Sequence, residues 1–500
     1  MRLHRFLSAW IALVAQLGGG LLLAGVLAQA QAPPQALPAP PVPAPLVLAG
    51  GTIIDVTNWG HSARDQQNAI VIVSEGRIVA VGSRADVPIP QGARVIDCTG
   101  KYLIPGLVDG FAGMNSQGQA SANLYMGVTT VVARSDAEHG RIDFAANPRP
   151  HLYIVDSIGS TDNWSLLIGH NDWTAELKEG AHPAELSPEE TARQMTATQH
   201  LGTRVLWLGP DLTAINTQWI VARAHQLGLV TYGEFVSTPY TVGIEAGVDT
   251  LLHMGRYELG VIPDELQRPL AEDPYGGAAA TAYDYAQHLP PTDQHLRAYA
   301  RFIASHHAAL LPTFSVYFLS LPGHRNLWRE PAASLLDPAN LSDPPDRITG
   351  ELNYPLPFWS RHLPALTQRW MEEGQRKKAD QAASRLWEIN ETIFFTAGPH
   401  YLAGSGAPVM GAMPGIGMHT ELEMMVRLGL SPREALAAAT NNYALQFGWT
   451  ELGQIAPGRR ADILVVDGDP TENPWNARRI STLILEGNVL NRDALLNSHR

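Results

Sequence analysis

Short strand-like runs alternate with helical stretches through the middle of this 500-residue chain, and this alternation constrains the fold most strongly. The strand-like runs are VTTVVAR, HLYIVDSIG, TRVLWLG, GLVTYGEF, VDTLLHM, AALLPTF and HYLAGSG. Ser187 and Ser431 are each followed by a proline and, three residues later, by a glutamate, which is typical of a helix start. Strands that alternate with helices form parallel sheets. Seven or eight such units over about 340 residues favour a closed (β/α)8 barrel over an open sheet.

A different pattern frames this alternation at both ends of the chain. LVLAGGTIIDV, AIVIVSEGRIVAVG and ARVIDCTGKYLIPG read as strands near the start, and ADILVVDGD and ISTLILEGNVLN read as strands near the end. We therefore predict an α/β chain in which a small composite β-sandwich is built from both ends. The predicted boundaries are 47–104 and 451–495 for the sandwich and 105–450 for the barrel.

Two stretches of the predicted barrel are longer than one strand-helix unit. They are residues 255–300 and residues 315–395, and the second includes a long polar helix near 363–396. Loops at the carboxyl ends of barrel strands carry function in this architecture, so we expect these insertions to lie over the barrel opening.

The first residues have the layout of a secretory signal peptide. Arg2 and Arg5 precede an uncharged apolar run, and small-x-small patterns place cleavage after Ala30 or Ala32. We predict a signal peptide at 1–30, a Pro-rich linker at 31–46 and an exported, periplasmic or extracellular protein with no stable membrane span after cleavage. The apolar run is long enough to span a bilayer, so an uncleaved anchor remains the alternative.

Composition excludes several other classes of protein. Lys and Arg number 35 against 48 Asp and Glu, and the net charge of −13 argues against binding to nucleic acid or to anionic lipid. Cys98 is the single cysteine, which excludes an internal disulfide and a Cys-rich metal cluster. A small-molecule ligand remains compatible with this composition.

Four segments together resemble the metal-dependent amidohydrolases, in their imidazolonepropionase- and prolidase-like branch. They are PGLVDG at 105–110, AGVDTLLH at 246–253, ELEMMVRLGLSPREALAAATNNYALQFG at 421–448 and LGQIAPGRRADILVVDGDP at 452–470, and the resemblance covers about residues 46–495. It implies a (β/α)8 barrel beside a composite β-sandwich, with one or two divalent ions at the carboxyl ends of the strands. In that family an HxH pair, a carboxylated Lys, two His and an Asp hold the ions. The metal then activates a water that hydrolyses carbon–nitrogen bonds, and the Asp accepts its proton.

The chain departs from that ligand set at five of six positions. The two HxH positions, the Lys position, one His position and the Asp position are replaced; they hold Phe111, Gly113, Trp207, Gly233 and Gly406. A shift of one residue in the alignment would place Glu234 instead of Gly233 at the His position. His253 alone matches a metal ligand of the family. Because one imidazole cannot hold a zinc-type ion, we predict no metal and no other cofactor.

Two histidines are the candidate substrate-binding residues, and no catalytic residue is assigned. His170 lies in LLIGHND, which resembles the family's GGHGD loop, and either lines the pocket or lies on the surface. His253 is either a ligand or an imidazole hydrogen-bonded to a neighbour. Weaker candidates near the opening are Asp109, Asp162, Asp172, Glu234, Trp164, Trp173, Trp207 and Tyr232. We expect His225 to be a packing or capping residue on a helix. We expect the rings of His306 and His307 to point in different directions, because the two residues are adjacent in the chain.

Three functions follow from these observations. The first is an exported amidohydrolase-like protein, a pseudoenzyme that has lost metal catalysis and keeps a pocket for binding or assembly. The second is an active hydrolase of carbon–nitrogen bonds, in dipeptides or non-peptide substrates, with a site rebuilt from His170, Glu234 and His253 and with zinc or another divalent metal bound. The third is a scaffold in an exported complex.

Overall fold

A computed structural model describes residues 44–134, 148–158, 185–200, 202–274, 277–352 and 365–497. The predicted signal peptide and nearly all of the predicted linker lie outside these ranges. Within them, no helix has both the length and the apolar character needed to cross a membrane.

Seven parallel strands form the central sheet, in chain order, with each strand paired to the next. They are β6 (Leu107–Asp109), β7 (Val128–Ala133), β8 (His151–Ile158), β9 (Thr203–Leu208), β10 (Val230–Gly233), β11 (Thr250–Leu252) and β12 (Ala309–Leu311). This sheet alternates with helices, which confirms the predicted α/β class. We call the carboxyl ends of these strands, with the loops that follow them, the mouth.

The predicted eighth strand, HYLAGSG, does not form a regular ladder in the described structure. Leu402 donates its N–H to Leu310 O in β12, and Gly110 donates to Ala403 O, so this segment bonds to both edges of the sheet. Its strand pairing is limited to one isolated parallel bridge between Leu310 and Tyr401. The domain is therefore barrel-like with seven strands, and a complete eight-stranded barrel is not confirmed.

Side chains from alternate strand positions fill the inside of the curled sheet. This interior cluster comprises Val108, Val132, Tyr153, Val155, Val205, Trp207, Val230, Tyr232, Leu252, Ala309, Leu311 and Leu402, together with Tyr443, Trp449 and Leu452. The period of two along each strand explains why Val205 and Trp207, or Val230 and Tyr232, share the inner face. The interior is thus a packed core, as expected for this architecture.

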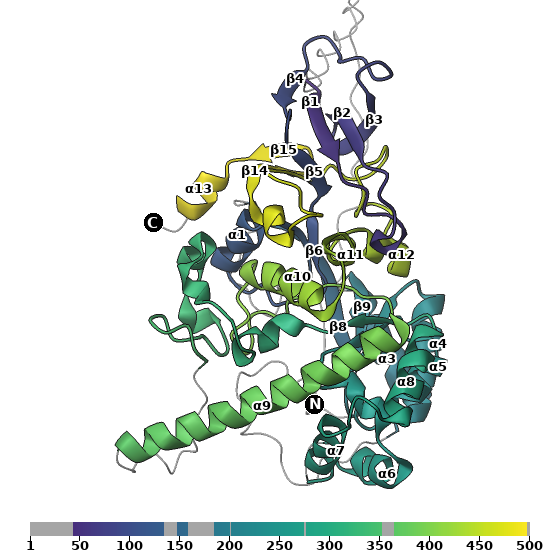
Figure 1. Cartoon of the computed structure of the whole chain (residues 1–500). Helices are drawn as coiled ribbons and strands as arrows, with labels where there is room; N and C mark the ends of the chain where they lie inside the picture. Colours follow the sequence, from purple (N-terminus) through teal and green to yellow (C-terminus); the bar gives the residue numbers. More distant parts are fainter. Residues whose placement is uncertain are drawn as a thin grey trace, which may run out of the picture. The chain divides into compact units, whose positions relative to one another are not determined.

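Helices and short 3-10 turns connect and cover the strands (Figure 1). The helices are α1 (Gln117–Tyr125), α3 (Pro188–His200), α4 (Ala214–Gln226), α5 (Tyr240–Glu245), α6 (Asp264–Glu272), α7 (Gly277–Gln287), α8 (Gln294–Ala304), α9 (Ala365–Ala397), α10 (Ile416–Leu428), α11 (Pro432–Ala438), α12 (Asn441–Phe447) and α13 (Arg492–Asn497). The 3-10 turns are η1 (Asn58–Gly60), η3 (Tyr257–Val261), η4 (Phe314–Ser320), η5 (Leu327–Arg329), η6 (Pro331–Leu335), η7 (Pro338–Asn340) and η9 (Pro474–Arg478). Ser431 forms a complete capping box with Glu434 at the start of α11, and Ser187 accepts a hydrogen bond from the Glu190 N–H at the start of α3. The two sequence patterns therefore mark real helix starts.

Strands from both ends of the chain form a second sheet, in the order β15-β14-β13-β5-β1-β2-β3, with β4 beside β1 (Figure 1). They are β1 (Leu46–Ile53), β2 (Gln66–Ser74), β3 (Arg77–Ser83), β4 (Arg94–Asp97), β5 (Tyr102–Pro105), β13 (Ile463–Val466), β14 (Ile480–Leu485) and β15 (Asn488–Leu490). β5 and β13 pair antiparallel and so join the two ends of the chain. The hydrogen-bonded strands form one mixed eight-stranded sheet, to which both ends of the chain contribute as predicted.

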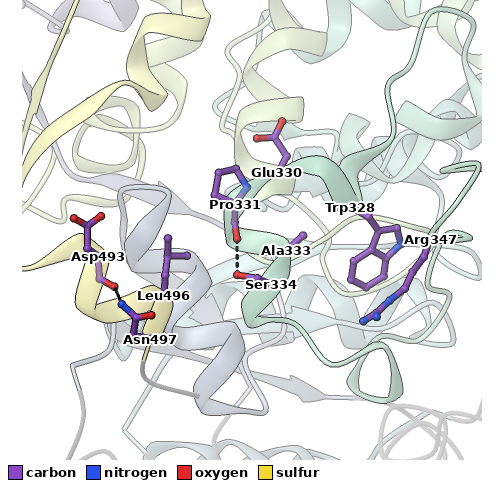
Figure 2. Close-up of a pocket in the computed structure, with 9 residues that line it drawn as sticks. All are labelled: Trp328, Glu330, Pro331, Ala333, Ser334, Arg347, Asp493, Leu496 and Asn497. Atoms are coloured by element: carbon purple, nitrogen blue, oxygen red, sulfur yellow. Dashed lines mark hydrogen bonds between the residues drawn. The ribbon is translucent and has the colours of Figure 1, made fainter. Parts of the chain in front are cut away.

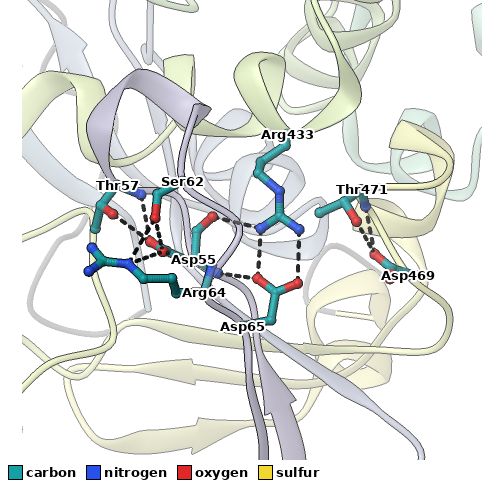
Figure 3. A network of polar contacts seen from close by, with 8 residues as sticks. All are labelled: Asp55, Thr57, Ser62, Arg64, Asp65, Arg433, Asp469 and Thr471. Atoms are coloured by element: carbon teal, nitrogen blue, oxygen red, sulfur yellow. Dashed lines mark hydrogen bonds and ion pairs between the residues drawn. The ribbon is translucent and has the colours of Figure 1, made fainter.

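A polar network joins the segment between β1 and β2 to α11 (Figure 3). Arg433 donates two hydrogen bonds to the carboxylate of Asp65, at 2.7 and 2.8 Å, and a third to the carbonyl of Asp55. Burial alone would raise the pKa of the Asp55 side chain, but hydrogen bonds from Ser62 and Thr57 lower it to about 2. Arg433 therefore links the segment between β1 and β2 to helix α11 through hydrogen bonds.

Candidate functional site

Aromatic side chains occupy the inner part of the mouth. Phe111 follows β6, and its ring lies edge-on to Trp207 near the end of β9, with 5.1 Å between ring centroids. The same ring lies edge-on to His253 at 5.0 Å and at 6.5 Å from Tyr232. Phe111 thus packs between a tryptophan and the one histidine that matches a family ligand.

The strand β10 directs Glu234 rather than Gly233 into this site. A Cβ on Gly233 would meet the ring of Phe235 at 2.5 Å and Val248 at 3.2 Å, both of which belong to the outer core. Glu234 accepts a hydrogen bond from Trp207 Nε1 at 3.1 Å, and its Oε1 lies 3.0 Å from Arg256 Nε. Of these two residues, Glu234 is therefore the one whose side chain lies beside Trp207 and Arg256.

His253 and Thr313 have unusual backbone conformations and contact each other. Their φ angles are 64° and 48°, in the left-handed region that a β-branched residue such as threonine rarely adopts. His253 Nδ1 lies 2.8 Å from Thr313 Oγ1, and its Nε2 lies 3.8 Å from Glu234 Oε2. Burial lowers the pKa of His253, so the imidazole is neutral near pH 7. Backbone strain of this kind collects at functional sites.

Arg256 supplies the positive charge of the mouth, and sequence reasoning missed it. Besides its ion pair with Glu234, Nη1 donates to the hydroxyl of Tyr283 on α7. Burial disfavours the charge on Arg256, but Tyr283 and Glu234 outweigh that effect and raise its pKa. The sequence signal was weak, because Arg256 stands in the turn after β11 and its partners come from other elements.

Asp109 at the end of β6 is buried and bonded to the neighbouring segment. Ser405 donates both its N–H, at 2.7 Å, and its hydroxyl, at 2.5 Å, to the Asp109 carboxylate. Burial raises the pKa of Asp109 to about 6. Asp109 therefore holds the segment that links the sheet edges, and it also accepts a hydrogen bond from the backbone N–H of Phe111 in its own turn.

The two remaining glycines at family ligand positions are closely packed. A Cβ on Gly113 would meet Pro408 at 2.8 Å. Gly406 has a φ of 63°, and a Cβ there would meet Val316 at 2.6 Å and Thr313 at 3.3 Å. A carboxylate in place of Gly406 would require the backbone to change.

Several other candidates from the sequence lie away from the mouth. His225 on α4 is hydrogen-bonded to Asp249, with 3.0 Å between Nε2 and Oδ2. Asp249 directly precedes β11, so this pair lies at the opposite end of the strands from the mouth. His307 Nε2 lies 3.9 Å from the same carboxylate, while the ring of His306 packs on Phe302. Asp162, Trp164, His170, Asp172 and Trp173 lie outside the described residues.

A cavity of about 670 Å³ lies between η5, η6 and α13 (Figure 2). Trp328, Glu330 and Arg347 line one part of it, and Asp493 and Asn497 of α13 line another. None of the side chains grouped around Phe111, Trp207, Glu234, His253 and Arg256 lines this cavity, and it contains none of the predicted site residues.

Across the described ranges, no three His, Cys, Asp or Glu side chains are grouped so that they could hold a metal ion. Around the Phe111 ring the mouth offers Glu234 and His253 as donors, and the Asp109 carboxylate at the end of β6 is already bonded to Ser405. Both oxygens of Glu234 already have partners: Oε2 accepts a hydrogen bond from Trp207 Nε1, and Oε1 forms an ion pair with Arg256. Zinc-type sites need three or four protein ligands, so this donor set does not fit the ion that the resemblance implies.

Comparison with known sequences supports the amidohydrolase resemblance for the C-terminal part of the chain. Residues 391–490 match the sequence model of the amidohydrolase family. A 5-methylthioadenosine/S-adenosylhomocysteine deaminase from Symbiobacterium thermophilum is 41% identical over 64 residues, which are 13% of this chain and 14% of that protein. An adenine deaminase from Agrobacterium fabrum is 47% identical over 68 residues, 14% of this chain and 11% of that protein. The matches thus span only a small part of these relatives.

Solved structures are similar over most of the chain. A Xaa-Pro dipeptidase with methionine bound has a TM-score of 0.57 and 15% identity, and the match covers 90% of this chain and 100% of that one. A bottromycin amidohydrolase has a TM-score of 0.58 and 17% identity, with 90% and 87% covered. The ochratoxinase of A. niger has a TM-score of 0.55 and 16% identity, with 89% and 95% covered. At these identities the likeness concerns the fold.

Proposed function

We propose that this chain, whose residues 391–490 match the amidohydrolase family model, binds a small molecule at the barrel mouth and does not carry out metal-dependent hydrolysis. We also propose that it is exported, because residues 1–32 have the layout of a cleaved signal peptide. Sequencing the N-terminus of protein recovered from the periplasm or medium tests export, with a start at Gln31 or Pro33 as the expected result.

The ion pair of Glu234 is the observation that carries the first proposal. Glu234 is the carboxylate that β10 brings to the mouth, and its side chain is only 7% exposed. Arg256 and Trp207 bind its two oxygens, and a divalent ion placed there would stand beside a guanidinium of the same sign. Binding of a metal would therefore require the ion pair to break in a partly desolvated site.

The residues around this pair support the same conclusion. The Phe111 ring packs against Trp207 and His253, which leaves carbon where relatives have metal ligands. Gly406 cannot accept a proton from an attacking water, so the family's general base has no counterpart at its own position. At the positions that the resemblance assigns, the described residues supply neither the ligands that activate the water nor the Asp that removes its proton.

Metal analysis together with an activity panel tests the proposal. Protein purified without chelator should contain less than about 0.1 metal ion per chain, and its melting temperature should not change when EDTA is added. Dipeptides, lactams and cyclic imides should not be hydrolysed. Near-stoichiometric zinc, manganese or iron would overturn the proposal.

A working hydrolase with a rebuilt site is the second candidate, and the strained pair of His253 and Thr313 favours it. Thr313 orients the imidazole, and a neutral Nε2 could act as a general base. If any substrate of the panel turns over, and His253→Ala reduces the rate at least about 100-fold while a surface control such as His295→Ala does not, this candidate replaces the first.

A further inference from the structure

We infer that the mouth binds an organic carboxylate, with the Arg256 guanidinium as its anchor and the aromatic side chains as the wall for its apolar part. This inference rests on the proposed function, because a resident divalent ion would itself bind carboxylates. It adds the chemical class of the ligand and the residue that selects it.

Two contacts hold the Arg256 guanidinium, and part of its side chain is exposed. Its Nε is fixed on Glu234 at 3.0 Å, and its Nη1 is fixed on Tyr283. The Arg256 side chain is 37% exposed, whereas that of Glu234 is 7% exposed. A guanidinium has five N–H donors in a rigid plane, so donors remain for a ligand after these two contacts. The pairing also fixes the plane of the guanidinium, which lowers the entropic cost of bidentate binding.

In this ion pair the side chain of Arg256 is more accessible than that of Glu234. Both oxygens of Glu234 face nitrogen donors of the protein, Trp207 Nε1 and Arg256 Nε. The other carboxyl close to Arg256 is that of Glu258, which is buried, accepts hydrogen bonds from Gly255 N–H and Asn390, and has its pKa raised by burial to about 7. The accessible charge is therefore positive, which favours an anion.

The remaining wall is apolar or neutral. Phe111 presents a half-buried ring that is nearly perpendicular to both Trp207 and His253, with interplanar angles of 83° and 79°. The His253 side chain is 21% exposed and neutral near pH 7. A ring or branched alkyl group beside the carboxylate would bury apolar surface against these side chains.

Calorimetry on the full-length chain with a matched series of probes tests this inference. Hydrocinnamate, its amide and phenylpropylamine share one phenylalkyl group and differ in charge. We expect hydrocinnamate to bind about 10-fold or more tightly than the amide and the amine, because a charge-assisted bidentate contact is stronger than a neutral one. Arg256→Gln should remove this preference, and the exposed control Arg268→Gln on α6 should keep it.

A second variant protects the test against misfolding, because Arg256→Gln leaves Glu234 buried without its partner. Arg256→Gln combined with Glu234→Gln removes both charges, and it should keep the circular dichroism spectrum while losing the preference for hydrocinnamate. Equal or tighter binding of the amine or the amide overturns the inference, as does a preference that survives in the double variant. Absence of hydrocinnamate binding to metal-free protein overturns this inference alone, whereas stoichiometric metal in the same sample overturns the proposed function.

Discussion

A double-mutant cycle across Glu234 and Arg256 measures whether the mouth is held together by its internal ion pair. Removing one partner of a buried pair costs about 3–5 kcal/mol, because the other charge is left uncompensated. Since the Arg256 side chain is 37% exposed, we expect Arg256→Gln to cost less, about 2–3 kcal/mol. Glu234→Gln keeps an acceptor for Trp207 Nε1 and should cost about 1–2 kcal/mol.

The two substitutions together should cost about 2 kcal/mol less than the sum of their separate effects, because the double variant leaves no unpaired charge. The free energy of unfolding of each variant is measured by urea unfolding, with tryptophan fluorescence and circular dichroism as two probes. The comparison uses the first unfolding transition that both probes detect at the same urea concentration. The pair Glu190–Arg193 on α3 is a matched control, because its side chains are 34% and 72% exposed and solvent screening should make its coupling much smaller. Additive effects at Glu234 and Arg256 would refute the reasoning.

Three further predictions concern packing, capping and pH. Phe111→Ala should destabilise the protein by about 2–3 kcal/mol in urea unfolding and shift the emission of Trp207 to the red, because the half-buried ring that contacts the indole is lost; an unchanged spectrum would contradict the contact. Ser431→Ala should lower the free energy of unfolding by about 1 kcal/mol, because α11 loses its capping box. A decrease of less than a few tenths of a kcal/mol in urea unfolding would contradict a stabilising cap at this residue. The pKa of Asp55 is lowered from 3.8 to about 2, so its contribution to stability is present above pH 4 and is lost as the pH falls toward 2. Melting temperatures of Asp55→Asn should therefore depend less steeply on pH in this window than those of the wild type, and parallel curves would contradict the shift.

Much of the fold follows from the local sequence. The predicted long helix near 363–396 is α9 (Ala365–Ala397), and the predicted strand TRVLWLG is β9 (Thr203–Leu208). The first is a long run of helix-forming residues and the second is a short apolar run rich in strand formers, so local composition is sufficient. The segment HYLAGSG has the composition of a strand, but Ser405 N–H bonds to the Asp109 side chain and Ala403 N–H to the Ala438 carbonyl instead of a ladder. Such partners are set by tertiary packing and have no local signal.

Sequence periodicity predicts only those residues of the candidate site that continue the alternation of a strand. Val230 and Tyr232 face the interior, so the same parity points to Glu234 and away from Gly233. Arg256 and Thr313 could not be found in this way. Arg256 follows the left-handed turn at His253, and Thr313 is 60 residues further along the chain than that histidine.

The pairing of β5 with β13 has a consequence for how the protein is made. β5 ends at Pro105 and β13 ends at Val466, so the two strands leave the ribosome far apart in time. Until β13 emerges, this edge of β5 exposes unpaired backbone groups, which invite pairing with other chains. Nascent chains should therefore depend on chaperones until late in translation, and products that stop before β13 should aggregate.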